Sequence, residues 1–119
     1  MSDEFIETAT KEINDEISEL DKILSTCQND ANVFSSAEKF QKHTHKIKGL
    51  APMMKKEDLG SFSAILDSIL KKMMDGVTID GVFNVLCDSI SSMKQYMSEP
   101  DYNLVEIKIR ISQILNNQN

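Results

Sequence analysis

Residues 58–76, DLGSFSAILDSILKKMMDG, carry the clearest helical pattern in a chain of 119 residues. Apolar side chains recur there every three or four positions, namely at Leu59, Phe62, Ile65, Leu66, Ile69, Leu70 and Met73. This spacing gathers them on one face of an α-helix, and Gly76 stands where a glycine often ends one. The segment predicts a helix over residues 56–75 that buries one face in a core.

Three further amphipathic stripes surround this segment. They predict helices over residues 3–27, 32–51 and 79–98. Ser2 or Asp3 is the expected N-cap of the first helix, Thr78 can cap the helix over residues 79–98, and Pro100 is the expected stop of that helix. Because the connections are short, neighbouring helices should run antiparallel. The expected fold is all-α, an up-and-down four-helix bundle in a single domain that spans residues 1–119.

The final segment fits two patterns. Apolar and charged residues alternate over residues 105–111, as in a half-buried strand. Leu104, Ile107, Ile111 and Ile114 also fit one face of a helix. A lone strand would leave its backbone donors and acceptors without partners, so we expect an additional C-terminal fifth helix over residues 102–116.

The composition argues against several classes of protein. A formal net charge of −6 disfavours non-specific binding to nucleic acid, which requires a basic surface. No apolar run reaches the roughly 18 residues that a membrane span needs, so no membrane insertion is expected. The acidic N-terminus lacks the basic flank of a signal peptide, which favours a cytoplasmic location. The two cysteines, Cys27 and Cys87, form no CxxC motif, so neither a disulfide framework nor a zinc finger is indicated.

The charges are unevenly distributed along the chain. Residues 1–30 contain nine acidic residues and two lysines, whereas residues 31–74 contain eight lysines and four acidic residues. This lysine excess is either an ordinary solvated helix face or a surface that attracts a small anion or an acidic partner. Both histidines of the sequence, His43 and His45, lie in this basic segment.

The spacing of the two histidines argues against a metal site. Two residues apart on a helix, their side chains point roughly 160° away from each other, so they cannot bind one metal ion together. The sequence also contains no Glu-x-x-His pair of the kind that binds metal inside helical bundles. We therefore expect no metal site. The helical period places both histidines near the border between core and solvent and does not distinguish between them.

The neighbouring residues favour His45. Lys48 lies one turn further along the helix, where its ammonium group can approach an anion on the ring, and Gly49 leaves the ring unshaded. His43 has Ile47 at the position equivalent to Gly49. A solvent-facing imidazole beside an ammonium group is suited to carrying a phosphoryl group, although a surface histidine without a function fits the same pattern.

The run His45-Lys46-Ile47-Lys48-Gly49 matches the signature H-x-[IL]-K-G, and it resembles the signature of histidine phosphotransfer (HPt) domains. The likeness is greatest to the N-terminal phosphotransfer domain of CheA-type chemotaxis kinases. An acidic first helix, the signature on the second helix and the stripe on the third follow the order and spacing of that family over roughly the first hundred residues. The trailing helix resembles the fifth helix of the family.

The resemblance implies roles for four residues. His45 would be the phosphoacceptor, Lys48 would stabilise the phosphoryl group, and Gly49 would keep access to the ring open. Asp67 stands where the family has a glutamate that orients the ring, and its side chain is one methylene shorter. The sequence departs from the family at Ala64, where many members have a second histidine, and at Lys55-Lys56, where many have Gly-Phe.

The resemblance also implies partners. A histidine kinase catalytic domain would donate the γ-phosphoryl group of ATP to His45, and a response-regulator receiver domain with bound Mg²⁺ would accept it on an aspartate. The sequence has no glycine-rich phosphate-binding motif, so ATP and Mg²⁺ belong to those partners, no bound cofactor is expected, and the chain is not an enzyme by itself. We expect the N-terminal domain of a CheA-like histidine kinase. The alternatives are a standalone HPt protein and a helical adaptor that is not phosphorylated.

Overall fold

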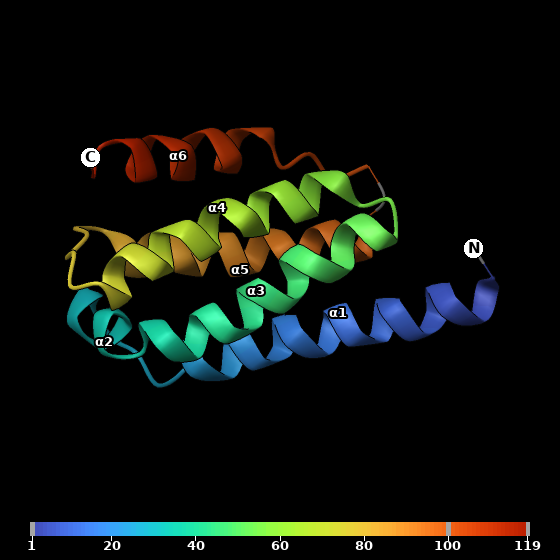
Figure 1. Cartoon of the computed structure of the whole chain (residues 1–119), viewed down its shortest axis with the longest axis horizontal. Coiled ribbons are helices and arrows are strands. Elements are labelled where there is room, and N and C mark those ends of the chain that lie inside the picture. Colours follow the sequence, from blue (N-terminus) through green and yellow to red (C-terminus); the bar gives the residue numbers. More distant parts are fainter. Residues whose placement is uncertain (1, 100, 119) are drawn as a thin grey trace.

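The computed structural model describes residues 2–99 and 101–118 (Figure 1). In this part of the chain there are six helices, α1 (Asp3–Leu24), α2 (Asp30–Ser35), α3 (Ala37–Met53), α4 (Glu57–Met74), α5 (Val82–Ser98) and α6 (Val105–Asn116), and no strand. The expected all-α class is confirmed, and residues 105–111 are helical. The expected stop at Pro100 lies outside the described residues.

The segment expected as one helix over residues 32–51 is instead two helices. Ser36, at φ −104° and ψ 8°, interrupts the helix between α2 and α3. Asn29 caps α2, since its Oδ1 accepts a hydrogen bond from the backbone N–H of Asn32 at 2.9 Å. The break lets α2 pack against α5 while α3 packs against α1 and α4. Val33 and Ala37, on either side of the break, are both buried as a result.

Several of the remaining boundaries differ from expectation by a few residues, whereas the ends at Ser98 and Asn116 agree with it. Ser2 caps α1, because its Oγ accepts a hydrogen bond from the N–H of Phe5 at 3.1 Å. The helix ends at Leu24 rather than at residue 27. The fourth expected helix begins at Val82 rather than at residue 79, and its N-cap is Gly81, in the left-handed conformation at φ 84°, rather than Thr78. The last expected helix begins at Val105 rather than at residue 102.

The apolar stripes of the long helices form one core. Its largest fully buried side chains are Ile13, Leu20, Phe40, Ile47, Leu59, Phe62, Leu66, Ile69, Leu70, Met73, Leu86 and Ile90. The helical pattern of the last segment is also confirmed, because Leu104 and Ile111 are buried whereas Val105 and Ile109 are exposed. The stripe of α1 reaches the core only from Ala9 onward, and Phe5 and Ile6 before it remain exposed.

Consecutive long helices run in alternating directions, and α3 lies between α1 and α4 (Figure 1). Among the described helices, α3 and α4 have the most extensive contact, and α6 packs along α4 and α5. Every described helix is too short or too polar to cross a lipid bilayer.

The ends of α3 and α4 approach each other closely at Pro52 and Gly60. A Cβ atom on Gly60 would lie 2.8 Å from Cγ of Pro52, so only glycine fits there without a shift. The intervening turn is closed by hydrogen bonds from the N–H of Lys56 to the carbonyl of Ala51 at 2.9 Å and from the N–H of Lys55 to that of Pro52 at 3.0 Å. Lys55 takes the left-handed conformation, at φ 60°. This turn sets α4 antiparallel to α3 along the side that carries the candidate site.

Candidate functional site

The candidate site lies between α3 and α4, with the buried carboxylate of Asp67 at its centre. Asp67 is 1% exposed. Its Oδ1 accepts a hydrogen bond from Nε2 of Gln41 at 2.8 Å and lies 3.5 Å from Oγ1 of Thr44. Its Oδ2 lies 3.1 Å from Nζ of Lys71 and 3.5 Å from Nζ of Lys48. Both oxygens therefore face donors, which a buried carboxylate requires.

These donors keep Asp67 charged. Burial raises the pKa of a carboxyl group, because it disfavours the charged form. For Asp67 this effect is outweighed by the hydrogen bonds from Gln41 and Lys71 and by the positive charges of Lys71 and Lys48, so its pKa is lower than the ordinary value. The site thus combines one buried negative charge with two partly exposed ammonium groups.

His45 lies at the solvent side of this cluster. Its side chain is 60% exposed, and its Nδ1 lies 3.8 Å from Oδ2 of Asp67. This distance is longer than a hydrogen bond but short enough for an electrostatic interaction. The second ring nitrogen, Nε2, is on the opposite edge of the imidazole. An exposed imidazole can act as a nucleophile through Nε2, and a carboxylate near Nδ1 can stabilise the positive charge that the ring then acquires.

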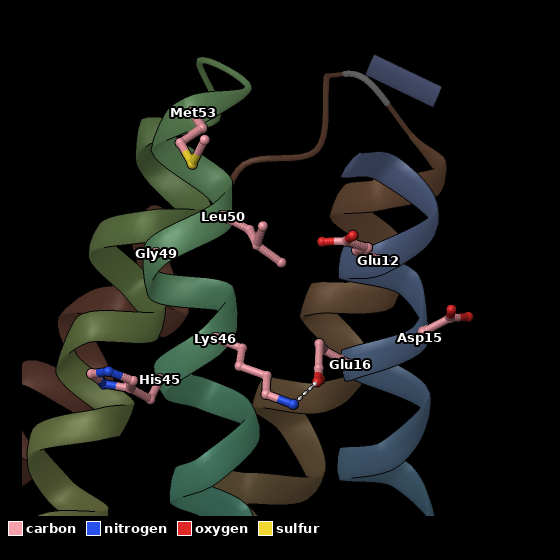
Figure 2. A pocket seen from close by; sticks show the side chains of 8 residues that line it. All are labelled: Glu12, Asp15, Glu16, His45, Lys46, Gly49, Leu50 and Met53. Carbon is pink, nitrogen blue, oxygen red and sulfur yellow. Dashed lines mark ion pairs between the residues drawn. The ribbon is translucent and has the colours of Figure 1, made fainter. Parts of the chain in front are cut away.

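His43 has different surroundings, although it is only two residues away. Its side chain is 14% exposed, and its Nδ1 lies 3.2 Å from both carboxylate oxygens of Glu16 on α1. Glu16 is itself buried and also pairs with Lys46, whose Nζ lies 3.4 Å from Oε1, as the dashed line in Figure 2 marks. His43 is thus enclosed between α1 and α3, which leaves His45 as the accessible histidine.

Gly49 borders a groove between α1 and α3 (Figure 2). The groove has a volume of about 650 Å³, and His45 and Gly49 form part of its wall. A Cβ atom on Gly49 would meet no atom of the chain within 4 Å. Internal packing therefore does not require a glycine here, unlike at Gly60. Its absent side chain leaves the surface beside the imidazole open.

The residues inferred from the sequence come together around one carboxylate. His45 and Lys48 both lie near Oδ2 of Asp67, and Gly49 lies one turn beyond His45 on α3. Sequence reasoning missed Gln41 and Lys71, which supply the shortest contacts to Asp67. Each lies four residues from a site residue on the same helix, Gln41 before His45 and Lys71 after Asp67, and that spacing was the available signal.

Among residues 2–99 and 101–118, no group of three or more His, Cys, Asp or Glu side chains is arranged to hold a metal ion. Comparison of the chain with protein-family models, with curated proteins and with solved structures found no match.

Proposed function

We propose that this chain is a histidine phosphotransfer domain in which His45 accepts a phosphoryl group from a histidine kinase catalytic domain and passes it to an aspartate of a response-regulator receiver domain. The observation that carries the proposal is the shared contact of His45 and Lys48 with the buried carboxylate of Asp67. The pattern of residues 45–49 supports it independently.

The chemistry assigns one task to each residue. In the neutral imidazole with the proton on Nδ1, the Nε2 lone pair forms a bond to the γ-phosphorus of ATP, and the bond from that phosphorus to the bridging oxygen breaks, so ADP leaves with the electron pair. The ring becomes positively charged, and Asp67 stabilises that charge through Nδ1–H. Lys48 stabilises the negative charge on the phosphoryl oxygens. In transfer to the receiver, a carboxylate oxygen of the aspartate forms a bond to the phosphorus, the bond from Nε2 to the phosphorus breaks, and the electron pair returns to the ring, which becomes neutral again.

The proposed domain supplies an accessible imidazole and no ATP site of its own. The kinase would bring ATP, the receiver would bring Mg²⁺, and the relay would operate in the cytoplasm. In this proposal α1, α3, α4 and α5 correspond to the four-helix bundle of HPt domains, α6 to the additional helix, and the chain to the N-terminal domain of a CheA-like chemotaxis kinase.

Phosphorylation by a CheA-type kinase core with ATP tests the proposal. We expect acid-labile phosphate on wild-type protein, and we expect His45→Gln to abolish it while His43→Gln retains it. Peptide mapping by mass spectrometry locates the phosphate. Label that survives in His45→Gln would exclude His45, and an unlabelled wild-type chain would exclude a carrier for such a kinase.

The groove beside Gly49 favours a second candidate, a helical adaptor without phosphorylation. Met53 lines both this groove and a smaller neighbouring pocket that Phe5 also lines, and the exposure of both apolar side chains suits binding of another protein. An adaptor would bind its partner equally well as wild type and as His45→Gln, and neither would be phosphorylated. A standalone HPt protein would be phosphorylated as above without being joined to a kinase.

A further inference from the structure

Lys71 is closer to the site carboxylate than either of the residues that the sequence pattern singled out. Its Nζ lies 3.1 Å from Oδ2 of Asp67, compared with 3.5 Å for Lys48 and 3.8 Å for Nδ1 of His45. The side chains of Lys71 and Lys48 are 51% and 41% exposed. Both ammonium groups therefore lie near the same carboxylate oxygen as Nδ1 of His45, and both side chains remain partly exposed to solvent.

Oδ2 of Asp67 cannot serve all three groups equally well. A carboxylate oxygen has about two lone-pair sites, and Lys71 and Lys48 lie nearest to them. Oδ1 faces Gln41 and Thr44 instead. The Nδ1 of His45 is consequently left beyond hydrogen-bond distance. Movement of an ammonium group away from Oδ2 would leave a lone-pair site there for a hydrogen bond from Nδ1 of His45.

We propose that Lys71 is a second phosphate-binding residue of the His45 site, and that Lys48 and Lys71 move from Asp67 to the phosphoryl group when it is attached. This inference rests on the proposed function. A phosphoryl group carries up to two negative charges, and a single ammonium group would leave one of them uncompensated beside Asp67. The departure of the ammonium groups frees Oδ2 to accept a hydrogen bond from Nδ1–H of His45, so the ring becomes oriented as the charge arrives.

Chemical phosphorylation of the whole chain with phosphoramidate tests this role without a kinase. The Nε2 lone pair forms the new N–P bond, the P–N bond of the protonated donor breaks, and ammonia leaves with its electron pair. The ring keeps its Nδ1 proton, which Asp67 accepts in a hydrogen bond. Lys71→Gln removes the charge at the site, and Lys71→Arg retains it. Lys22→Gln is the control, because it removes an exposed charge on α1.

We expect Lys71→Gln to phosphorylate at His45 about ten-fold more slowly than wild type, because a cation at the developing charge is lost. Lys71→Arg and Lys22→Gln should stay within about two-fold of wild type. A titration of the ³¹P resonance separates this role from a structural one. With Lys71 present, the phosphoryl group should lose its last proton at lower pH than in Lys71→Gln, because a neighbouring cation favours the dianion.

Equal rates and equal ³¹P titrations in wild type and Lys71→Gln would overturn the inference, and so would a wild-type His45 that phosphoramidate does not modify. An equal decrease of the phosphorylation rate in Lys22→Gln would show that only the net charge of the protein matters, and would also overturn the inference. Transfer from a kinase is a separate measurement. Its failure would refute the proposed function while the phosphoramidate result still decides the role of Lys71.

Discussion

Among the residues of the site, Asp67 combines nearly complete burial with an ionised side chain. Its pKa in the folded chain is below the ordinary value of 3.8. The resulting stabilisation is fully present above that value and is lost as the pH falls through the lowered pKa, because the unfolded chain then binds the proton more readily. Asp67 should therefore contribute to the acid sensitivity of the fold.

We predict that Asp67→Asn lacks the part of the acid-induced destabilisation that wild type shows from about pH 4 downward. Urea unfolding at a series of pH values gives the free energy of unfolding of each protein. Lys71→Gln should show a smaller acid effect than wild type, because Lys71 contributes to the lowered pKa. Parallel pH profiles of wild type and Asp67→Asn would contradict the role given to Asp67.

Gly49 and Gly60 lie in neighbouring helices, and we predict opposite effects on replacing them with alanine. Gly49→Ala should raise the free energy of unfolding by about 0.5–1 kcal/mol, because alanine is a better helix former and the space is open. Gly60→Ala should lower it, because the new Cβ would meet Pro52.

Replacement of Gly49 should also affect phosphorylation. If Gly49 keeps the imidazole accessible to a kinase, Gly49→Ala should be phosphorylated by the kinase core several-fold more slowly while being more stable than wild type. Urea unfolding and initial phosphorylation rates on the same samples check both parts. A Gly49→Ala protein with an unchanged rate would remove Gly49 from the site.

At the scale of elements, the turn between α3 and α4 contains one residue in an unfavourable conformation. Lys55 has φ 60°, which costs a residue with a side chain about 1 kcal/mol and costs glycine almost nothing. We predict that Lys55→Gly raises the free energy of unfolding by about 0.5–1 kcal/mol, less than the full cost because glycine also makes the unfolded chain more flexible.

Lys55→Ala is the matched control, because it removes the charge and retains the Cβ atom. It should leave the stability of wild type nearly unchanged, as measured by urea unfolding. The neighbouring Lys56, whose Nζ lies 5.4 Å from the centre of the Tyr96 ring, is unaltered in both variants. Equal stability of the glycine and alanine variants would show that the left-handed conformation is not the cause.

The sequence predicted well those helices whose apolar residues recur at a regular spacing within the helix itself. The buried face of α4 could be predicted from the spacing of its apolar residues alone. All of these residues except the half-buried Ile65 are buried. The proximity of Lys48 to His45 followed from their spacing of three residues along one helix. The proximity of Lys71 to Asp67 and Lys48 did not follow, because Lys71 and Lys72 are adjacent and the choice between them depends on the rotation of α4 against α3.

Other boundaries depend on contacts between distant residues. The break at Ser36 and the start of α5 at Val82 have no sufficient local signal. Gly81, which precedes α5, has no side chain with which to cap it. The caps come instead from Asp30, the first residue of α2, which is remote in sequence. A periodic pattern cannot reveal such an interaction, because it is set by the packing of α2 against α5.

At the scale of the whole molecule, Asp30 joins two distant parts of the chain. Its Oδ2 accepts a hydrogen bond from the N–H of Gly81 at 2.8 Å, and its Oδ1 accepts one from the N–H of Phe83 at 2.8 Å. These N–H groups belong to the beginning of α5, where a helix has unpaired donors and favours a negative charge. One side chain thus caps α5 and fixes α2 beside it.

We predict that Asp30→Ala lowers the free energy of unfolding by about 1–2 kcal/mol, because two hydrogen bonds to a charged acceptor are lost at once. Asp30→Asn retains one oxygen acceptor, so its free energy of unfolding should lie between those of Asp30→Ala and wild type. Asp80→Ala removes an exposed charge next to Gly81 without removing either of these bonds, and should have a smaller effect.

Urea unfolding measures the global effect, and amide hydrogen exchange locates it. The N–H of Phe83 should exchange faster in Asp30→Ala than in wild type, while amides in the middle of α4 change only by the global loss of stability. Because the His45 site lies between α3 and α4, phosphorylation of folded Asp30→Ala should proceed at the wild-type rate. A slower rate in the folded protein would mean that the position of α2 affects the site.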